Sequence, residues 1–336
     1  MTATNAHHTG LLALITLLAA SAPALGQELE RPLRPVHTYS IVAMDAETGE
    51  MGVAVQSHWF SVGSSVAWAE SGVGAIATQS FIDPSYGANG LVLMRTGSTA
   101  AQALAGLLAA DAHPEVRQVG MVDASGGTSV HTGSLAIQEA CDFEGEAFTV
   151  QANLMHRPTV CDAMVGAYES SPGDLAERLM AALEAAEAEG GDIRGRQSAA
   201  LLVVAAQASG RPWQDRVFDL RVDDHREPLV ELRRLLSVAR AYHHMNEGDE
   251  QVTQGNVDAA VDEYERAEAL LPGESEPIFW HAVTLASVGR VEESLPLFAD
   301  AYRLRPEWRE LVPRLAPARL LPDDPEMISK IVSAGE

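Results

Sequence analysis

The chain has 336 residues, of which 46% are hydrophobic, and this is enough for a buried core and for two domains. Forty-seven acidic residues outnumber 23 basic ones, which gives a formal net charge of −24. This charge disfavours nucleic acid and anionic membranes as partners, because both would repel the protein surface.

The N-terminal segment has the pattern of an export signal. Ten apolar residues at positions 11–20 are followed by Ala22, Ala24 and Gly26, which have the spacing that signal peptidase recognises. The run is too short to span a bilayer, and no later run reaches the roughly 20 apolar residues of a membrane helix. Residues 1–26 are therefore predicted to be a cleaved signal peptide, and the product is expected to be secreted or periplasmic. The segment before the apolar run has no Lys or Arg, so a wrongly assigned start site is the alternative.

Two β-hairpins are predicted next. Residues 39–43 and 51–57 are short apolar runs rich in β-branched residues, and the segment between them contains Asp45 and Gly49, which favour a tight turn. Residues 66–70 and 73–79 repeat the pattern around Ser71-Gly72. The small residues of this second hairpin suit strands packed closely under another layer.

The segments that follow come in blocks. Helices are predicted at 86–95, 99–110, 160–169 and 174–189, and strands at 117–122, 128–132, 147–153, 197–206 and 216–222. Thr99 and Gln102 have the spacing of a capping box at the start of the second helix. Since helices and strands do not alternate strictly, the pattern favours an α+β fold.

The C-terminal part contains a repeat. Glycine, aromatic and proline positions recur at an offset of 34 (289 − 255, 298 − 264 and 306 − 272), namely Gly255 and Gly289, Tyr264 and Phe298, and Pro272 and Pro306. This spacing resembles the tetratricopeptide family, and the resemblance implies helical repeats over residues 237–320 that recruit a protein partner. Two copies are fewer than the roughly three needed for independent stability, so we expect these helices to dock on the preceding domain or on a helix at 231–245.

Several ordered phrases of the N-terminal part resemble one bacterial family. They are TYSIVA from Thr38, GVAVQS from Gly52, GVGAIATQ from Gly72, RQVG from Arg117 and GGDIRGRQSAAL from Gly190. They resemble family 1028 of the domain-of-unknown-function series, which is grouped by fold with the N-terminal-nucleophile (Ntn) hydrolases. The resemblance implies a four-layer αββα sandwich over residues 37–236.

The same resemblance suggests a nucleophile. In Ntn hydrolases a residue at the start of a strand attacks the substrate, and its own α-amine is the general base. Thr38 occupies this position, but 37 residues precede it, and an amide nitrogen is not a base. Either the His37–Thr38 bond is cut, or Thr38 only opens a strand.

Further site residues are predicted by residue type. Asn153, Gln79 and Gln56 are neutral donors near strand ends that could stabilise an oxyanion, and each could equally be a satisfied core amide. Asp192 and Arg194 lie in a glycine-rich loop, where the pair could bind a substrate carboxylate or brace the loop.

Other chemistry is not indicated. The sequence has no Walker loop, HExxH or GxSxG motif, and the adjacent residues of Asp223-Asp224-His225 would point in different directions, which favours a turn over a metal site. No metal and no cofactor are predicted. Cys141 and Cys161 could form a disulfide or remain two buried thiols.

Two functions follow from these observations. The first is an exported Ntn-type amidohydrolase that acts on a small amide or peptide-like substrate. The alternative is a non-catalytic Ntn-fold binding module with a protein-interaction tail. The sequence does not predict the oligomeric state.

Overall fold

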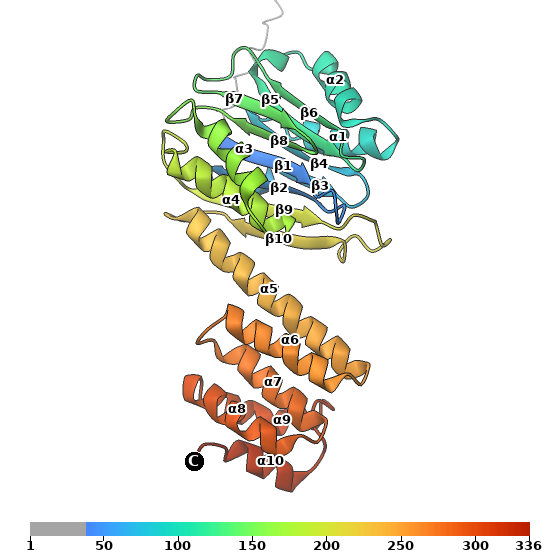
Figure 1. The fold of residues 1–336 in the computed structure, drawn as a ribbon, viewed down its shortest axis with the longest axis vertical. Helices are drawn as coiled ribbons and strands as arrows, with labels where there is room; N and C mark the ends of the chain where they lie inside the picture. The colour runs from blue at the N-terminus through green and yellow to red at the C-terminus, as the bar shows by residue number, and fades with distance from the viewer. Residues whose placement is uncertain (1–37) are drawn as a thin grey trace, which may run out of the picture. The chain divides into compact units, whose positions relative to one another are not determined.

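The computed structural model describes residues 38–336, which form two antiparallel β-sheets and ten α-helices (Figure 1). The predicted α+β class is confirmed. The predicted signal peptide at 1–26 and the residue His37 lie outside the described residues. Within residues 38–336, no helix has both the length and the apolar composition required to cross a membrane.

The larger sheet has the strand order β10-β9-β2-β1-β8-β7 and the smaller one β3-β4-β5-β6. The strands of the larger sheet are β1 (Thr38–Met44), β2 (Met51–Ser57), β7 (Cys141–Gly145), β8 (Phe148–Ala152), β9 (Ser198–Val204) and β10 (Arg216–Val222). Those of the smaller sheet are β3 (Ala67–Glu70), β4 (Gly74–Ser80), β5 (Arg117–Asp123) and β6 (Thr128–Thr132). Both predicted N-terminal hairpins are confirmed, as β1–β2 and β3–β4, whereas β7 was not predicted.

Helices cover the outer face of each sheet. They are α1 (Ser85–Arg95) and α2 (Ala100–Ala110) on the smaller sheet and α3 (Val160–Ser170) and α4 (Leu175–Ala188) on the larger one. The predicted capping box is confirmed, because Thr99 Oγ1 accepts from Gln102 N while Gln102 Oε1 accepts from Thr99 N. Separate apolar clusters pack the smaller sheet against α1 and α2, the two sheets against each other, and the larger sheet against α3 and α4.

The two faces of β1 point into different layers. Side chains alternate along a strand, so residues 38, 40 and 42 share one face and residues 39, 41 and 43 share the other. Val42 packs between the two sheets, whereas Ile41 packs against α3 and α4. Thr38 and Ser40 therefore lie on the face turned to the smaller sheet.

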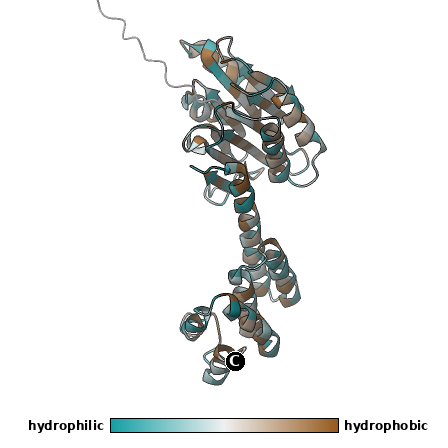
Figure 2. Cartoon of the chain, turned by 90° about the vertical axis from the view of Figure 1, so that its left-hand side faces the viewer, coloured by the Kyte–Doolittle hydropathy of each residue, from teal (hydrophilic) through white to brown (hydrophobic). Residues whose placement is uncertain are grey.

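The C-terminal helices are α5 (Pro228–Thr253), α6 (Val257–Leu270), α7 (Ser275–Ser287), α8 (Val291–Leu304), α9 (Trp308–Leu315) and α10 (Pro325–Val332). The first part of α5 packs on the larger sheet through Leu232 and Leu236, and its second part packs on α6 through Met245. The predicted domain boundary at 236/237 falls inside this continuous helix. Figure 2 shows hydrophobic and hydrophilic positions mixed along these helices, as expected for helices that bury one face.

The two cysteines form a disulfide. Cys141 of β7 and Cys161 of α3 are joined by an S–S bond of 2.00 Å with a Cα–Cα distance of 6.1 Å. Of the two alternatives that the sequence leaves open, the structure has the pair and not two thiols. The bond ties the edge strand of the larger sheet to the helix that covers it.

Candidate functional site

Thr38 is the first residue of β1, which is an inner strand of the larger sheet, and it is fully buried. It pairs with Ser57 of β2. Its backbone carbonyl accepts hydrogen bonds from Asn153 N at 3.1 Å and from Gln79 Nε2 at 3.2 Å. Gln79 belongs to the smaller sheet, and Asn153 directly follows β8 of the larger sheet. Residues from both sheets therefore meet at Thr38.

Six fully buried polar side chains lie between the sheets beside Thr38, and we call them the interlayer polar cluster. They are Ser40, Gln79, Gln118, Thr149, Gln151 and Asn153. Ser40 Oγ donates to Gln79 Oε1 at 2.6 Å and accepts from Gln151 Nε2 at 2.7 Å. Thr149 Oγ1 donates to Gln151 Oε1 at 3.1 Å. These mutual bonds compensate the desolvation of polar groups inside an otherwise apolar layer.

Gln118, near the start of β5, is the centre of this cluster. Its Oε1 accepts from Gln79 Nε2 and from Asn153 Nδ2, both at 2.8 Å. Its Nε2 lies within hydrogen-bond distance of three acceptors, namely Thr132 Oγ1 at 2.9 Å, Ala152 O at 2.9 Å and Cys141 O at 3.2 Å. One side chain thus connects four strands and the residue that follows β8.

Two of the three predicted oxyanion donors lie beside Thr38. Gln79 Nε2 has three acceptors within 3.2 Å, namely Thr38 O, Gln118 Oε1 and Gln151 O. An amide nitrogen carries only two hydrogens, so these acceptors engage both hydrogens of Gln79 Nε2. In this state the Gln79 side chain therefore bridges the two sheets. Asn153 reaches Thr38 through its backbone N and Gln118 through its side chain.

The third predicted donor, Gln56, lies on the other face of the larger sheet. It pairs with Tyr39, whose side chain points to the α3–α4 side. Gln56 is fully buried, and neither its Oε1 nor its Nε2 has a hydrogen-bond partner among residues 38–336. The structure therefore separates Gln56 from the interlayer polar cluster.

Asp192 and Arg194 form an ion pair within their own loop. Arg194 Nη2 lies 2.6 Å from Asp192 Oδ2, and Arg194 Nε donates to Asp192 Oδ1 at 3.0 Å. The Asp192 side chain is fully buried and also accepts from the backbone N of Arg194 and of His58. Asp192 thus braces the loop, as one of the two predicted roles requires, while the side chain of Arg194 is 27% exposed.

Two strands end near Thr38 in strained backbone. Ser80 follows Gln79 with φ = 68°, and Leu154 follows Asn153 with φ = 56°. A residue with a Cβ atom is unfavourable in this left-handed region, and such strain is common at functional sites. Ser80 is also fully buried, and its Oγ has no hydrogen-bond partner among the described residues.

We expect Ser80→Gly to raise the free energy of unfolding by about 1 kcal/mol. The change relieves the left-handed strain and removes an unpaired buried hydroxyl. Together these two gains exceed the free-energy cost of the extra conformational entropy that glycine gives the unfolded chain. Denaturant unfolding of the folded protein would measure the difference. Ser80→Ala is the matched control, since it removes the hydroxyl but keeps the strain, and it should stabilise less. A glycine variant less stable than the wild type would contradict this account.

An ion pair fixes the ends of β4 and β5 beside the cluster. Arg117, which precedes Gln118, donates through Nε to Asp111 Oδ2 at 2.6 Å and through Nη1 to Phe81 O at 2.5 Å. Tyr86 OH donates to the same carboxylate at 2.9 Å. The hydrogen bond from Arg117 lowers the pKa of Asp111 to about 2.

This shift makes stability depend on pH between about 4 and 2. The folded-state pKa of Asp111 lies below the ordinary value, so its contribution of about 2 kcal/mol is present above pH 4 and is lost as the pH falls. We expect Asp111→Asn to be less stable than the wild type at pH 5, and the difference should shrink toward pH 2. Unfolding free energies at several pH values would test this, and a difference that does not change with pH would contradict it.

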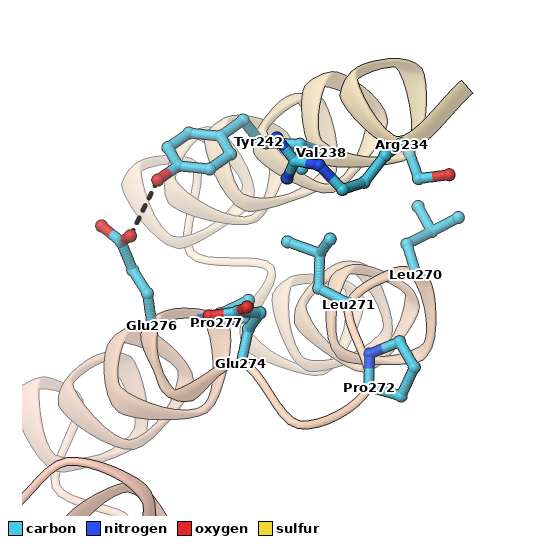
Figure 3. A pocket seen from close by; sticks show the side chains of 10 residues that line it. Arg234, Val238, Tyr242, Leu270, Leu271, Pro272, Glu274, Glu276 and Pro277 are labelled. Atoms are coloured by element: carbon cyan, nitrogen blue, oxygen red, sulfur yellow. Dashed lines mark hydrogen bonds between the residues drawn. The ribbon is translucent and has the colours of Figure 1, made fainter. Parts of the chain in front are cut away.

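A separate cavity of about 460 Å³ lies between α5 and the α6–α7 connection (Figure 3). Tyr242 OH donates to Glu276 Oε2 at 2.7 Å on one side of it, and Leu271 lines the other side. The hydroxyl of Ser237 in its wall donates to the carbonyl of Arg233. These lining side chains include the Tyr242–Glu276 hydroxyl–carboxylate pair, and none of them belongs to the interlayer polar cluster.

Sequence reasoning did not identify Gln118 as a site residue, although one local signal was present. Gly120 lies two residues further on the same strand face, and a Cβ atom there would lie 2.2 Å from Gln151 Oε1. A glycine inside a strand marks the close approach of another group. Gly120 in β5 is therefore a sequence signal for a close approach at this strand, which the structure shows to be that of Gln151 and Thr149.

Residues 38–232 match the sequence model described as "Family of unknown function (DUF1028)". Among solved structures, the chain is similar to the crystal structure of the DUF1028 protein SPO2555 from Silicibacter pomeroyi, with 29% sequence identity and a TM-score of 0.53. The similarity covers 60% of this chain and 88% of that chain. No curated protein matches the chain. The matched residues include Thr38 and the whole interlayer polar cluster.

Proposed function

Because the chain belongs to the family of unknown function DUF1028, we propose that it shares the Ntn-hydrolase-like αββα sandwich and is an exported Ntn-type amidohydrolase. Thr38 is its nucleophile, and a small amide or peptide-like compound is its substrate. The observation that carries the proposal is the position of Thr38, which opens an inner strand of the larger sheet and faces the smaller sheet. Amide groups from both sheets bind its carbonyl.

The chemistry requires that the His37–Thr38 bond is cut. The freed α-amine, with a pKa of about 8, can then take the proton of Thr38 Oγ1 while this oxygen bonds to the substrate carbonyl carbon. The C–N bond breaks, the leaving amine receives the proton, and an ester remains on Oγ1. Water hydrolyses this ester and restores the threonine.

Two further residues take part in the proposed reaction. Asn153 is bonded to Thr38 through its backbone, which places the residue beside the nucleophile, and its side-chain amide is the proposed oxyanion donor. Arg194 binds a substrate carboxylate, and the buried Asp192 orients its partly exposed guanidinium. Gln56 has no part in this mechanism, because it lies on the other face of the sheet.

Export is part of the proposal. The apolar segment at 11–20 and the small residues after it support a cleaved signal peptide. The Cys141–Cys161 disulfide also supports an oxidising compartment, since disulfides are rare in the cytosol.

The C-terminal helices are proposed to be tetratricopeptide-like repeats that recruit a protein partner. Helices α6 and α8 begin at Val257 and Val291, which are 34 residues apart (291 − 257). This distance equals the repeat period of the sequence.

The test of the proposed function uses protein purified from the periplasm or the culture medium of the organism that naturally produces it. N-terminal sequencing should find a species that begins at Thr38. A β-lactone, a strained cyclic ester that acylates hydroxyl nucleophiles, should add its full mass to this species, and peptide mapping should place it on Thr38. An N-terminus near residue 27 with no β-lactone adduct would favour the binding-module alternative.

A further inference from the structure

The carboxamide oxygen of Gln118 accepts hydrogen bonds from two other side-chain amides. Its Oε1 accepts from Gln79 Nε2 of the smaller sheet and from Asn153 Nδ2 next to the larger sheet, both at 2.8 Å. A carboxamide oxygen has two lone pairs, so both are engaged. The two residues bound in this way also bind the Thr38 carbonyl, Gln79 by the same side-chain amide and Asn153 by its backbone N–H.

The opposite end of Gln118 fixes its orientation. Its Nε2 faces only acceptors: the carbonyls of Ala152 and Cys141 and the hydroxyl of Thr132. A flipped amide would set its NH2 group against two other NH2 groups and its oxygen against two carbonyl oxygens. The network therefore permits one orientation only.

We propose that Gln118 is a positioning residue that fixes the Asn153 amide for the reaction at Thr38. The inference rests on the proposed function. A donor aimed before the substrate arrives stabilises an oxyanion without reorganisation, and small displacements of such a group reduce the rate strongly. Gln118 sets the plane of the Asn153 side chain through one bond and is itself held at its other end by three acceptors.

The chain offers a matched control in Gln151. This residue is also a fully buried glutamine of the interlayer polar cluster, and its side chain bonds to Ser40 and Thr149 but not to Asn153. Gln118→Met and Gln151→Met each replace an amide by an apolar side chain of similar length. A loss of stability common to both variants therefore reports the structural role of a buried amide.

The experiment measures covalent capture of Thr38 by a β-lactone in the processed chain, separated into the affinity for the probe and the maximal rate. We expect Gln118→Met to lower the maximal rate about 10²-fold with little change in affinity, and Gln151→Met to stay within about threefold of the wild type. Equal maximal rates in the two folded variants would overturn the proposal. A wild type that the probe does not capture at all would instead overturn the proposed function.

A second measurement does not depend on the folding of a variant. In the wild type, the Asn153 Nδ2 proton that is bonded to the buried Gln118 Oε1 should exchange slowly with solvent, which NMR measures. Rapid solvent exchange of both Asn153 Nδ2 protons in the folded wild type would overturn the positioning role, whatever the variants do.

Discussion

Replacing Thr38 by alanine should abolish turnover and β-lactone capture in the processed chain. The change removes the only oxygen that can form the ester, and the loss of a nucleophile of this kind lowers rates by about 10⁴-fold or more. The fold should persist, because the backbone pairing of β1 with β2 and β8 does not use this side chain. Mass spectrometry of the treated protein and its circular dichroism spectrum would measure both results.

Two variants define what the Thr38→Ala result means. Thr38→Ser keeps the hydroxyl and should be captured at a reduced rate, since only a methyl group is lost. Ser40→Ala removes another buried hydroxyl of the same strand face, two residues away, and should be captured at nearly the wild-type rate. If the alanine variant at position 38 were still captured like the wild type, another residue would be the nucleophile.

The parts of the fold that could be predicted are those determined by local sequence. In the β1–β2 turn, Asp45 Oδ1 accepts from the backbone N of Glu47 and Thr48, and Gly49 has φ = 74°. Asp and Gly are the residues that such a turn needs, so the hairpin could be read directly. The capping box at Thr99 is local in the same way.

The candidate site could be predicted only in part, because its contacts are distant in sequence. Gln118 is 39 residues from Gln79 and 35 from Asn153, so their meeting depends on which strands face each other across the two sheets. Gln56 lies on the α3–α4 face of the larger sheet because of the pairing register of β1 and β2. A shift of one residue in this register would turn its side chain to the other face. Residue type alone suggested Asn153, Gln79 and Gln56 equally as oxyanion donors.

The same limit applies to the edge strand β7. Its sequence, CDFEG, is short and mostly polar, and three of its five residues are exposed, so it has no apolar pattern. Its pairing with β8 and the disulfide to α3 hold it in place. The disulfide therefore has a structural role that its sequence context did not indicate.

Loss of this disulfide is expected to cost roughly 3 kcal/mol of unfolding free energy. The bond closes a loop with a sequence separation of 20, and a loop of this size restricts the unfolded chain by about that amount. The double variant Cys141→Ala, Cys161→Ala should therefore unfold at a clearly lower denaturant concentration than the oxidised wild type. The denaturation curve of the variant should also be at least as steep as that of the wild type, because the unfolded chain without the cross-link is less compact and exposes more surface.

Reduction of the wild type provides the control, because the sequence has only these two cysteines. A thiol reductant should lower the unfolding midpoint of the wild type toward that of the double variant and should leave the variant unchanged. The carbonyl of Cys141 accepts from Gln118 Nε2, so reduction should also slow the capture of Thr38 by a β-lactone if it loosens this contact. If the reductant leaves the wild-type midpoint unchanged while the thiols are shown to be free, the disulfide does not stabilise the fold, and the entropic account is wrong for this loop.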